Sequence, residues 1–146
     1  MLVNAARKAG RRVVFTNGCF DVIHAGHISL LERAAELGDV LVVALNDDHS
    51  VRGLKGEGRP VNDQEHRARV VGALGCVDAV VLFSEETPIR LIEAILPDVL
   101  VKGGDYAPDQ VVGADIVRGY GGAVRVLTLV EDVSTSAIVA RIQQDG

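Results

Sequence analysis

The chain has 146 residues, and this length fits a single domain, which we expect to span residues 1–146. Its 15 basic and 20 acidic residues give a formal net charge of −5, which argues against non-specific nucleic-acid binding. The two cysteines lie far apart, which gives no disulfide framework and fits a reducing compartment. The first ten residues carry no secretory signal, and no apolar run reaches the ~20 residues of a membrane helix. We therefore expect a soluble, cytoplasmic protein with no membrane partner.

Strand-like and helix-like segments alternate along the whole chain. Residues 13–15 are β-branched and aromatic, residues 16–18 break that pattern, and apolar residues then recur at helical spacing from Ile28 to Leu37. Further strands are expected at 40–45, 79–83, 99–101 and 124–127, and further helices at 63–74, 88–96, 110–118 and 134–143. This alternation predicts an α/β fold, a Rossmann-like three-layer sandwich around a five-stranded parallel sheet.

Polar and glycine-rich segments follow several of the predicted strands. They are residues 16–21, Asn46-Asp47, residues 102–105 and the stretch before Ser134. In parallel sheets, ligands bind at the carboxyl ends of the strands, near the switch in strand order. We therefore expect a ligand site that is built from these segments.

The most informative motif is His24-Ala25-Gly26-His27, where the first strand gives way to a helix. A helix start presents free backbone N–H groups and a partial positive charge, which suits a phosphate. Side chains three residues apart share one helix face, so His24 and His27 can point at the same anion. Two other interpretations of the histidines remain. They could be two ligands of a metal site, but zinc needs three or four ligands and no motif supplies the others. They could also be a purely structural pair.

Residues 52–60 form a second candidate feature, with the cations Arg52, Lys55 and Arg59 interleaved with three glycines. Glycine gives such a loop freedom to move, and its cations can close over phosphates as a lid. The alternative is an ordinary solvated loop. The Walker A string is absent, so this is not a P-loop.

Three further positions each have two interpretations. Ser134-Thr135-Ser136 precedes an apolar helix, either as a simple N-cap or as a second phosphate cradle. Arg67 is either a surface cation or a phosphate ligand, and Asp105 either accepts from a ribose hydroxyl or stabilises a turn. No Ser-His-Asp order occurs, which disfavours acyl chemistry, whereas nucleotidyl transfer needs mainly positioning and positive charge.

Taken together, these residues resemble the cytidylyltransferase-like nucleotidyltransferases. The resemblance rests on residues 16–21, the His24–His27 motif, Lys55, Arg67 and Ser134-Thr135, and it covers residues 12–143. Three segments, 54–56, 59–62 and 101–106, are similar to the adenylyltransferase domain of the bacterial ADP-heptose synthases. This branch implies transfer of AMP from ATP to D-glycero-β-D-manno-heptose 1-phosphate, with release of pyrophosphate.

The resemblance also implies roles for individual residues. Catalysis would fall to His24, His27 and Lys55, and acceptor binding to Asp21 and Arg59. Nucleotide binding would fall to Thr16, Asn17, Gly18, Phe20, Gly26, Arg67, Gly103, Asp105, Ser134 and Thr135. Mg²⁺ would travel with ATP, the protein itself would supply no metal site, and the enzyme would be a homodimer. The alternative is a cytidylyltransferase that acts on a polyol phosphate such as glycerol 3-phosphate.

The chain departs from its relatives at three places. Leu129-Val130 stands where glycerol-3-phosphate cytidylyltransferases carry an Arg-Thr pair, which favours the heptose branch. Ser134-Thr135-Ser136 replaces the usual Ser-Thr-Thr and keeps the hydroxyl. Many relatives carry an N-terminal sugar-kinase domain, for which the chain has no room, so either a separate kinase supplies the sugar phosphate or this is one domain of a longer protein.

Overall fold

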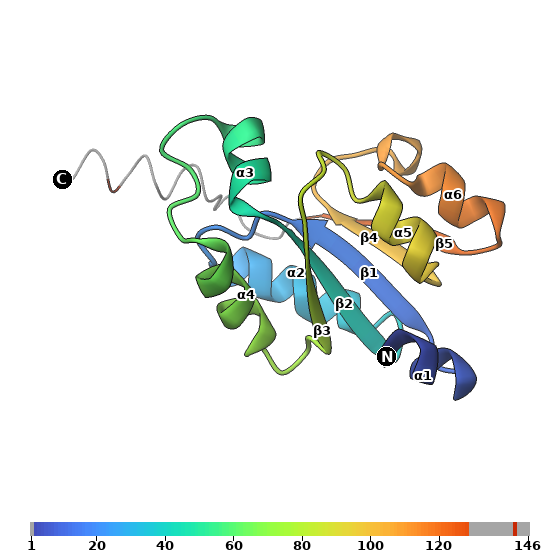
Figure 1. Ribbon diagram of the computed structural model, residues 1–146. Helices are drawn as coiled ribbons and strands as arrows, with labels where there is room; N and C mark the ends of the chain where they lie inside the picture. The colour runs from blue at the N-terminus through green and yellow to red at the C-terminus, as the bar shows by residue number, and fades with distance from the viewer. Residues whose placement is uncertain (1, 129–141, 143–146) are drawn as a thin grey trace.

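The described part of the chain is built on one sheet of five parallel strands (Figure 1). The structure, a computed structural model, describes residues 2–128 and 142. The strands are β1 Val13–Gly18, β2 Val40–Asn46, β3 Ala79–Phe83, β4 Val99–Gly103 and β5 Ala123–Leu127. Their order in the sheet is β3-β2-β1-β4-β5. The α/β fold class and the five-stranded parallel sheet are therefore confirmed, while a single domain over residues 1–146 stays a prediction.

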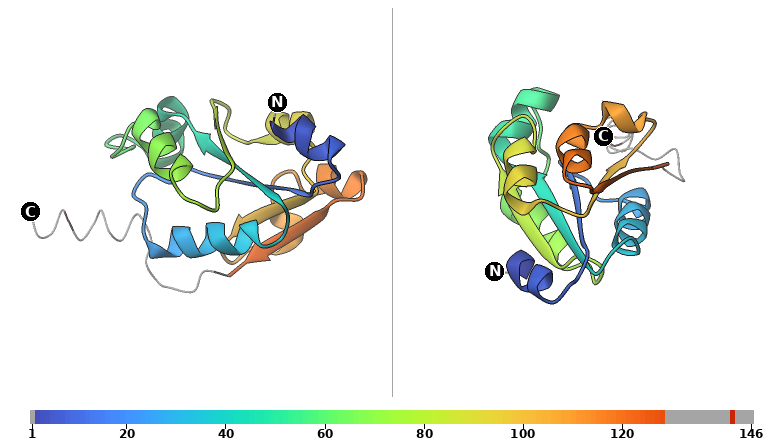
Figure 2. Two further views of the ribbon diagram at one scale, coloured as in Figure 1. Left: turned by 90° about the horizontal axis from the view of Figure 1, so that it is seen from below. Right: turned by 90° about the vertical axis from the view of Figure 1, so that its right-hand side faces the viewer.

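Helices cover both faces of the sheet and complete the three layers (Figure 2). They are α1 Leu2–Lys8, α2 Ala25–Ala35, α3 Asp48–Lys55, α4 Gln64–Gly72, α5 Ile89–Ile95, the 3₁₀ turn η1 Pro108–Gln110 and α6 Ala114–Gly119. Buried residues of α1, α5 and α6 pack on one face, and those of α2 and α4 on the other. None of the described helices is long and apolar enough to cross a membrane.

The strand sequences explain this layering. Successive strand side chains point to opposite faces, so Val13 and Phe15 enter one core while Val14 enters the other. All seven residues of β2 are buried, as expected for a central strand that is covered on both faces. A run of Val, Leu and Ala without alternation is thus the signature of the middle of this sheet.

Two expected boundaries differ from the structure. β1 continues through Gly18, because Asn17 and Gly18 pair with Ala44 and Leu45 of β2 rather than forming a turn. The helix expected at 110–118 is divided into η1 and α6, since Gly113 between them has a φ of 90°. The helix expected at 134–143 lies outside the described residues, apart from residue 142.

The largest difference concerns the predicted lid at 52–60. Its first four residues belong to α3, which the sequence interpretation missed, as it missed α1. The Asp47 side chain caps α3 by accepting from the Ser50 N–H, at 2.8 Å, and Val51 is fully buried. Lys55 is therefore the last residue of a helix, and only residues 56–60 are loop.

The strand order places the ligand crevice. The chain moves outward from β1 through β2 to β3 and then returns to the other side of β1 as β4. The carboxyl ends of β1 and β4, at Gly18 and Gly103, therefore flank the switch point, where parallel α/β sheets bind ligands.

Candidate active site

His24 and His27 form a reciprocal cap at the start of α2. Nδ1 of His24 accepts from the Gly26 N–H at 3.1 Å, and Nδ1 of His27 accepts from the His24 N–H at 3.2 Å. Their ring centroids lie 4.0 Å apart. Because each Nδ1 is an acceptor, the neutral rings carry their proton on Nε2. Both Nε2–H groups are thus left for a ligand at the positive end of a helix.

The His27 ring is held neutral. Burial is the main reason that its pKa is lowered to about 4, and electrostatic interactions with the neighbouring His24 and Lys55 side chains add to the effect. The Phe20 ring lies against it, with centroids 5.2 Å apart. A neutral donor beside the cation Lys55 suits an incoming phosphate, since the phosphate supplies the missing negative charge.

The turn between β1 and α2 depends on a glycine. Phe20 has a φ of 48°, and a Cβ on Gly18 would lie 2.9 Å from the Phe20 ring. This close approach explains why glycine stands at the end of β1. The turn thereby brings Phe20 against His27.

Asp21 holds the loop that follows α3. Its carboxylate accepts from Nε of Arg59 at 2.7 Å and from the backbone N–H groups of Val61 and Asn62 at 2.7 and 2.8 Å. Burial alone would raise the pKa of Asp21, but these three donors outweigh it and hold the pKa below its ordinary value. The Nη2 group of Arg59 is buried and has no protein partner among the described residues.

Arg67 joins several loops beneath the site. Its side chain is fully buried, and its guanidinium donates to the carbonyls of Asn62, Cys19 and Asn46 at 3.0, 2.8 and 2.7 Å. It also forms an ion pair of 2.9 Å with Asp48. Protein acceptors thus occupy Arg67 in this structure, and a direct contact with phosphate stays a prediction.

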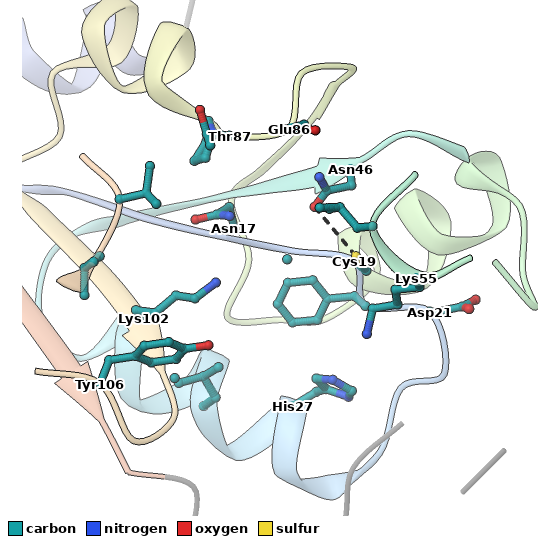
Figure 3. Close-up of a pocket in the computed structure, with 18 of the residues that line it drawn as sticks. Asn17, Cys19, Asp21, His27, Asn46, Lys55, Glu86, Thr87, Lys102 and Tyr106 are labelled. Atoms are coloured by element: carbon teal, nitrogen blue, oxygen red, sulfur yellow. Dashed lines mark hydrogen bonds between the residues drawn. The ribbon is translucent and has the colours of Figure 1, made fainter. Parts of the chain in front are cut away.

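These elements enclose a cavity of about 470 Å³ at the switch point (Figure 3). Of the residues expected from sequence, it brings together Asn17, Gly18, Phe20, Asp21, His27, Lys55, Arg59 and Gly103. They come from the ends of β1 and β4, the start of α2, the end of α3 and the loop after it. The structure therefore unites residues that stand up to 86 positions apart in the chain, from Asn17 to Gly103.

The other expected residues that the structure describes do not line the cavity. The Thr16 hydroxyl is buried and donates to the Val101 carbonyl at 2.9 Å, so it links β1 to β4. His24 and Gly26 lie in the cap behind His27, and Asp105 is exposed. Ser134 and Thr135 lie outside the described residues.

Several lining residues were not assigned a role from sequence. They are Cys19, Asn46, Glu86, Thr87, Lys102 and Tyr106. Asn46 and Lys102 stand at the carboxyl ends of β2 and β4, so the strand-end rule points to them. Nothing in the sequence pattern marks Glu86 and Thr87, because they enter on the loop between β3 and α5.

The described residues contain no group of three or more His, Cys, Asp or Glu side chains placed to hold a metal ion. The Asp21 carboxylate already has three N–H partners. The cavity that His27 lines also contains the cations Lys55 and Arg59, which suit an anion.

Comparison with known proteins agrees with this site. The family model described as cytidylyltransferase-like matches residues 15–141. The chain is 58% identical over 146 residues to the bifunctional protein HldE of Pseudomonas paraeruginosa, and 61% identical over 140 residues to that of Azorhizobium caulinodans. These alignments cover 100% and 96% of this chain but only 31% and 29% of the relatives, so the chain spans about a third of their length.

A solved structure extends the agreement to the fold. The lipopolysaccharide core biosynthesis protein of Thermoplasma volcanium is similar at a TM-score of 0.67 and 26% identity, over 85% of this chain and 100% of that chain. The family match covers most of the chain and contains the histidine motif at the strand-to-helix turn. The chain belongs to the cytidylyltransferase-like family of nucleotidyltransferases.

Proposed function

We propose that the chain transfers AMP from ATP to D-glycero-β-D-manno-heptose 1-phosphate and releases pyrophosphate. The observation that carries nucleotidyl transfer is the neutral His27 ring, which caps the start of α2 beside Lys55 in the cavity at the switch point. The choice of acceptor rests on the similarity of segments 54–56, 59–62 and 101–106 to the heptose branch. The high identity to HldE over the whole chain supports it.

In this reaction, an oxygen of the acceptor's phosphate attacks the α-phosphorus of ATP. A new P–O bond forms, the bond from the α-phosphorus to the bridging oxygen breaks, and pyrophosphate leaves with both electrons of that bond. The nucleophile is already an anion, so no general base is needed. The Nε2–H groups of His24 and His27 and the ammonium of Lys55 would stabilise the charge that grows on the α-phosphate oxygens.

Mg²⁺ would neutralise charge on the leaving pyrophosphate. The described residues offer no pair of free carboxylates beside the histidines, so we propose that Mg²⁺ enters on the phosphate oxygens of ATP. We also propose a homodimer, on the family resemblance alone. A cytoplasmic location is supported by the two described cysteines, which are both free thiols.

The test is a comparison of nucleotides and acceptors by pyrophosphate release. We expect turnover with ATP, Mg²⁺ and the heptose 1-phosphate, and much slower turnover when CTP replaces ATP. A clear preference for CTP with glycerol 3-phosphate would replace this proposal with the cytidylyltransferase alternative. If the chain binds ATP but releases no pyrophosphate with any sugar phosphate, it is a non-catalytic nucleotide-binding module.

A further inference from the structure

Lys102 is a cation in the cavity that the reaction described above does not use. It is the fourth residue of β4 and lines the cavity at the switch point. Among residues 2–128, its ammonium has no hydrogen bond and no ion pair. Burial lowers the pKa of Lys102, so the site holds a charge that the described protein leaves uncompensated. Lys102 is half-buried, and an uncompensated charge that is partly removed from water is costly unless a ligand pairs with it.

Lys102 lies apart from the cations that surround the histidines. Lys55 enters the cavity from the end of α3 and acts on the pKa of His27, whereas Lys102 is not among the groups that perturb that ring. The group whose charge affects Lys102 is Cys19. Figure 3 likewise shows Lys55 and Lys102 entering from different sides. The cavity therefore has two separate cationic positions.

The surroundings of Lys102 suit a polyol. In Figure 3, Asn17 is drawn on the same side of the cavity as the end of Lys102, and Thr87 and Glu86 line the same cavity. Amide, hydroxyl and carboxylate groups together donate to and accept from sugar hydroxyls. No such set is needed for a triphosphate, which requires cations and N–H donors only.

We propose that Lys102 binds the phosphate of the acceptor, and that the side of the cavity formed by Asn17, Glu86 and Thr87 receives the acceptor's hydroxyl groups. This inference rests on the proposed function and adds to it a binding subsite for the acceptor. Two anions must meet for the reaction, the acceptor's phosphate and the α-phosphate. A cation on the acceptor side offsets their repulsion while Lys55 and the histidines serve the nucleotide.

The experiment measures the two substrates separately in variants of Lys102. The dissociation constant of the heptose 1-phosphate is titrated in the presence of a non-hydrolysable ATP analogue, and that of ATP is titrated alone. Lys102→Gln should raise the dissociation constant of the heptose 1-phosphate by on the order of 10- to 100-fold, as expected for loss of a charge-assisted hydrogen bond. ATP affinity should change by less than about 3-fold, because the nucleotide keeps its other cations.

Two further variants make the result specific. Lys102→Arg keeps the charge and should restore most of the acceptor affinity. Lys8→Gln removes an exposed lysine of α1 outside the cavity and should match the wild type in both titrations. If Lys102→Gln weakens the binding of ATP and of the acceptor equally, Lys102 belongs to the nucleotide site. If the affinity for the acceptor is unchanged, Lys102 has no role in binding the acceptor. Either result overturns the inference.

A parallel titration with glycerol 3-phosphate separates this inference from the proposed function. If the wild type uses CTP and glycerol 3-phosphate instead, the proposed function fails. Lys102→Gln must then still weaken the binding of glycerol 3-phosphate. If the wild type binds neither ester in the presence of nucleotide, the acceptor subsite itself is wrong. Turnover of the wild type thus tests the function, and the Lys102 variants test the subsite.

Discussion

Each histidine of the motif uses one ring nitrogen for the fold and leaves the other for a ligand, and of the two rings it is His27 that lines the cavity. Nδ1 of His24 and of His27 accepts a backbone N–H of the α2 start, which would otherwise lack a partner. The Nε2–H groups remain for phosphate. Under the proposed function, stability and catalysis are therefore combined in the same two side chains, and a substitution can separate them only if it preserves the cap.

Asparagine at position 24 should make that separation. An Asn side chain accepts from the Gly26 N–H as an N-cap but does not reproduce the ring Nε2–H. We expect His24→Asn to keep the wild-type free energy of unfolding and His24→Ala to lower it by about 1 kcal/mol. Both should lower kcat by on the order of 10²-fold, as for loss of a charge-stabilising donor.

Urea unfolding and steady-state kinetics of the two variants decide this prediction. Wild-type activity in His24→Asn would show that the His24 ring serves the fold alone. Equal destabilisation of both variants would show that the contact between the two rings, rather than the cap, stabilises this turn.

At the scale of elements, α4 is connected to the segments around the site through the side chain of Arg67. Its guanidinium contacts the turn after β1, the end of β2, the start of α3 and the loop before α4. Three of the four acceptors are backbone carbonyls, which are costly to leave buried without a donor. Arg67 therefore positions the segments that carry Phe20 and Lys55, and its contact with the phosphates stays a prediction.

Arg67→Lys tests this positioning role. One ammonium cannot reach acceptors on four segments, so we expect the free energy of unfolding to fall by about 2–4 kcal/mol. Arg69→Lys makes the same change at an exposed position of α4 and should stay within about 0.5 kcal/mol of wild type. If Arg67→Lys instead keeps its stability and loses only ATP affinity, the phosphate contact expected from sequence is correct.

The end of α3 sets the position of Lys55. Gly56, the next residue, has φ 88° and ψ −176°, a conformation that is essentially restricted to glycine. Gly56→Ala should therefore destabilise this turn by about 1–3 kcal/mol, displace Lys55 and lower kcat. Gly53→Ala is the control, because its Cβ meets open space inside α3 and should stabilise the helix by up to about 1 kcal/mol.

Thermal unfolding and kcat of the two glycine variants are compared directly. A Gly56→Ala variant with wild-type kcat would show that the reaction does not depend on how α3 ends. Loss of activity in Gly53→Ala, whose backbone is helical, would mean that mobility within α3 matters more than the position of its last residue.

The strands could be predicted from sequence because buried parallel strands have a simple requirement, an uninterrupted run of apolar residues such as residues 40–45. α3 could not, because its eight residues DHSVRGLK include one glycine and mostly polar side chains. Its cap by Asp47 and the burial of Val51 stabilise it, and burial depends on the tertiary structure. Local pattern therefore predicts the sheet better than the helix at its edge.

At the scale of the whole molecule, the strand order converts separated segments into one cavity. The sequence predicts that the ends of β1, β2 and β4 meet, and the histidine motif predicts a phosphate site there. It does not predict which strand-end side chains face inward. Thr16 and Lys102 are each the fourth residue of their strand, yet the Thr16 hydroxyl is bonded to the neighbouring strand and Lys102 lines the cavity.

Two residues that line the cavity, His27 and Asp21, make the stability of the whole molecule depend on pH in two steps. The pKa of His27 is lowered from 6.5 to about 4, chiefly by burial, and the pKa of Asp21 is held below 3.8 by its N–H partners, which outweigh burial. For both groups, the unfolded chain binds a proton at a higher pH than the folded protein does. Stability is therefore lost as pH falls, between about 6.5 and 4 for His27 and below 3.8 for Asp21.

Urea unfolding over a series of pH values between 7.5 and 3 should show this profile in the wild type. His27→Gln should abolish the upper step and leave the lower one, because glutamine does not titrate. His66→Gln removes a histidine whose side chain is 71% exposed and should retain both steps. Wild-type stability that stays constant between pH 7.5 and 5 would show that the His27 ring takes up its proton equally well in the folded protein. The neutral donor on which the proposed transfer depends would then be absent near the lower end of that range.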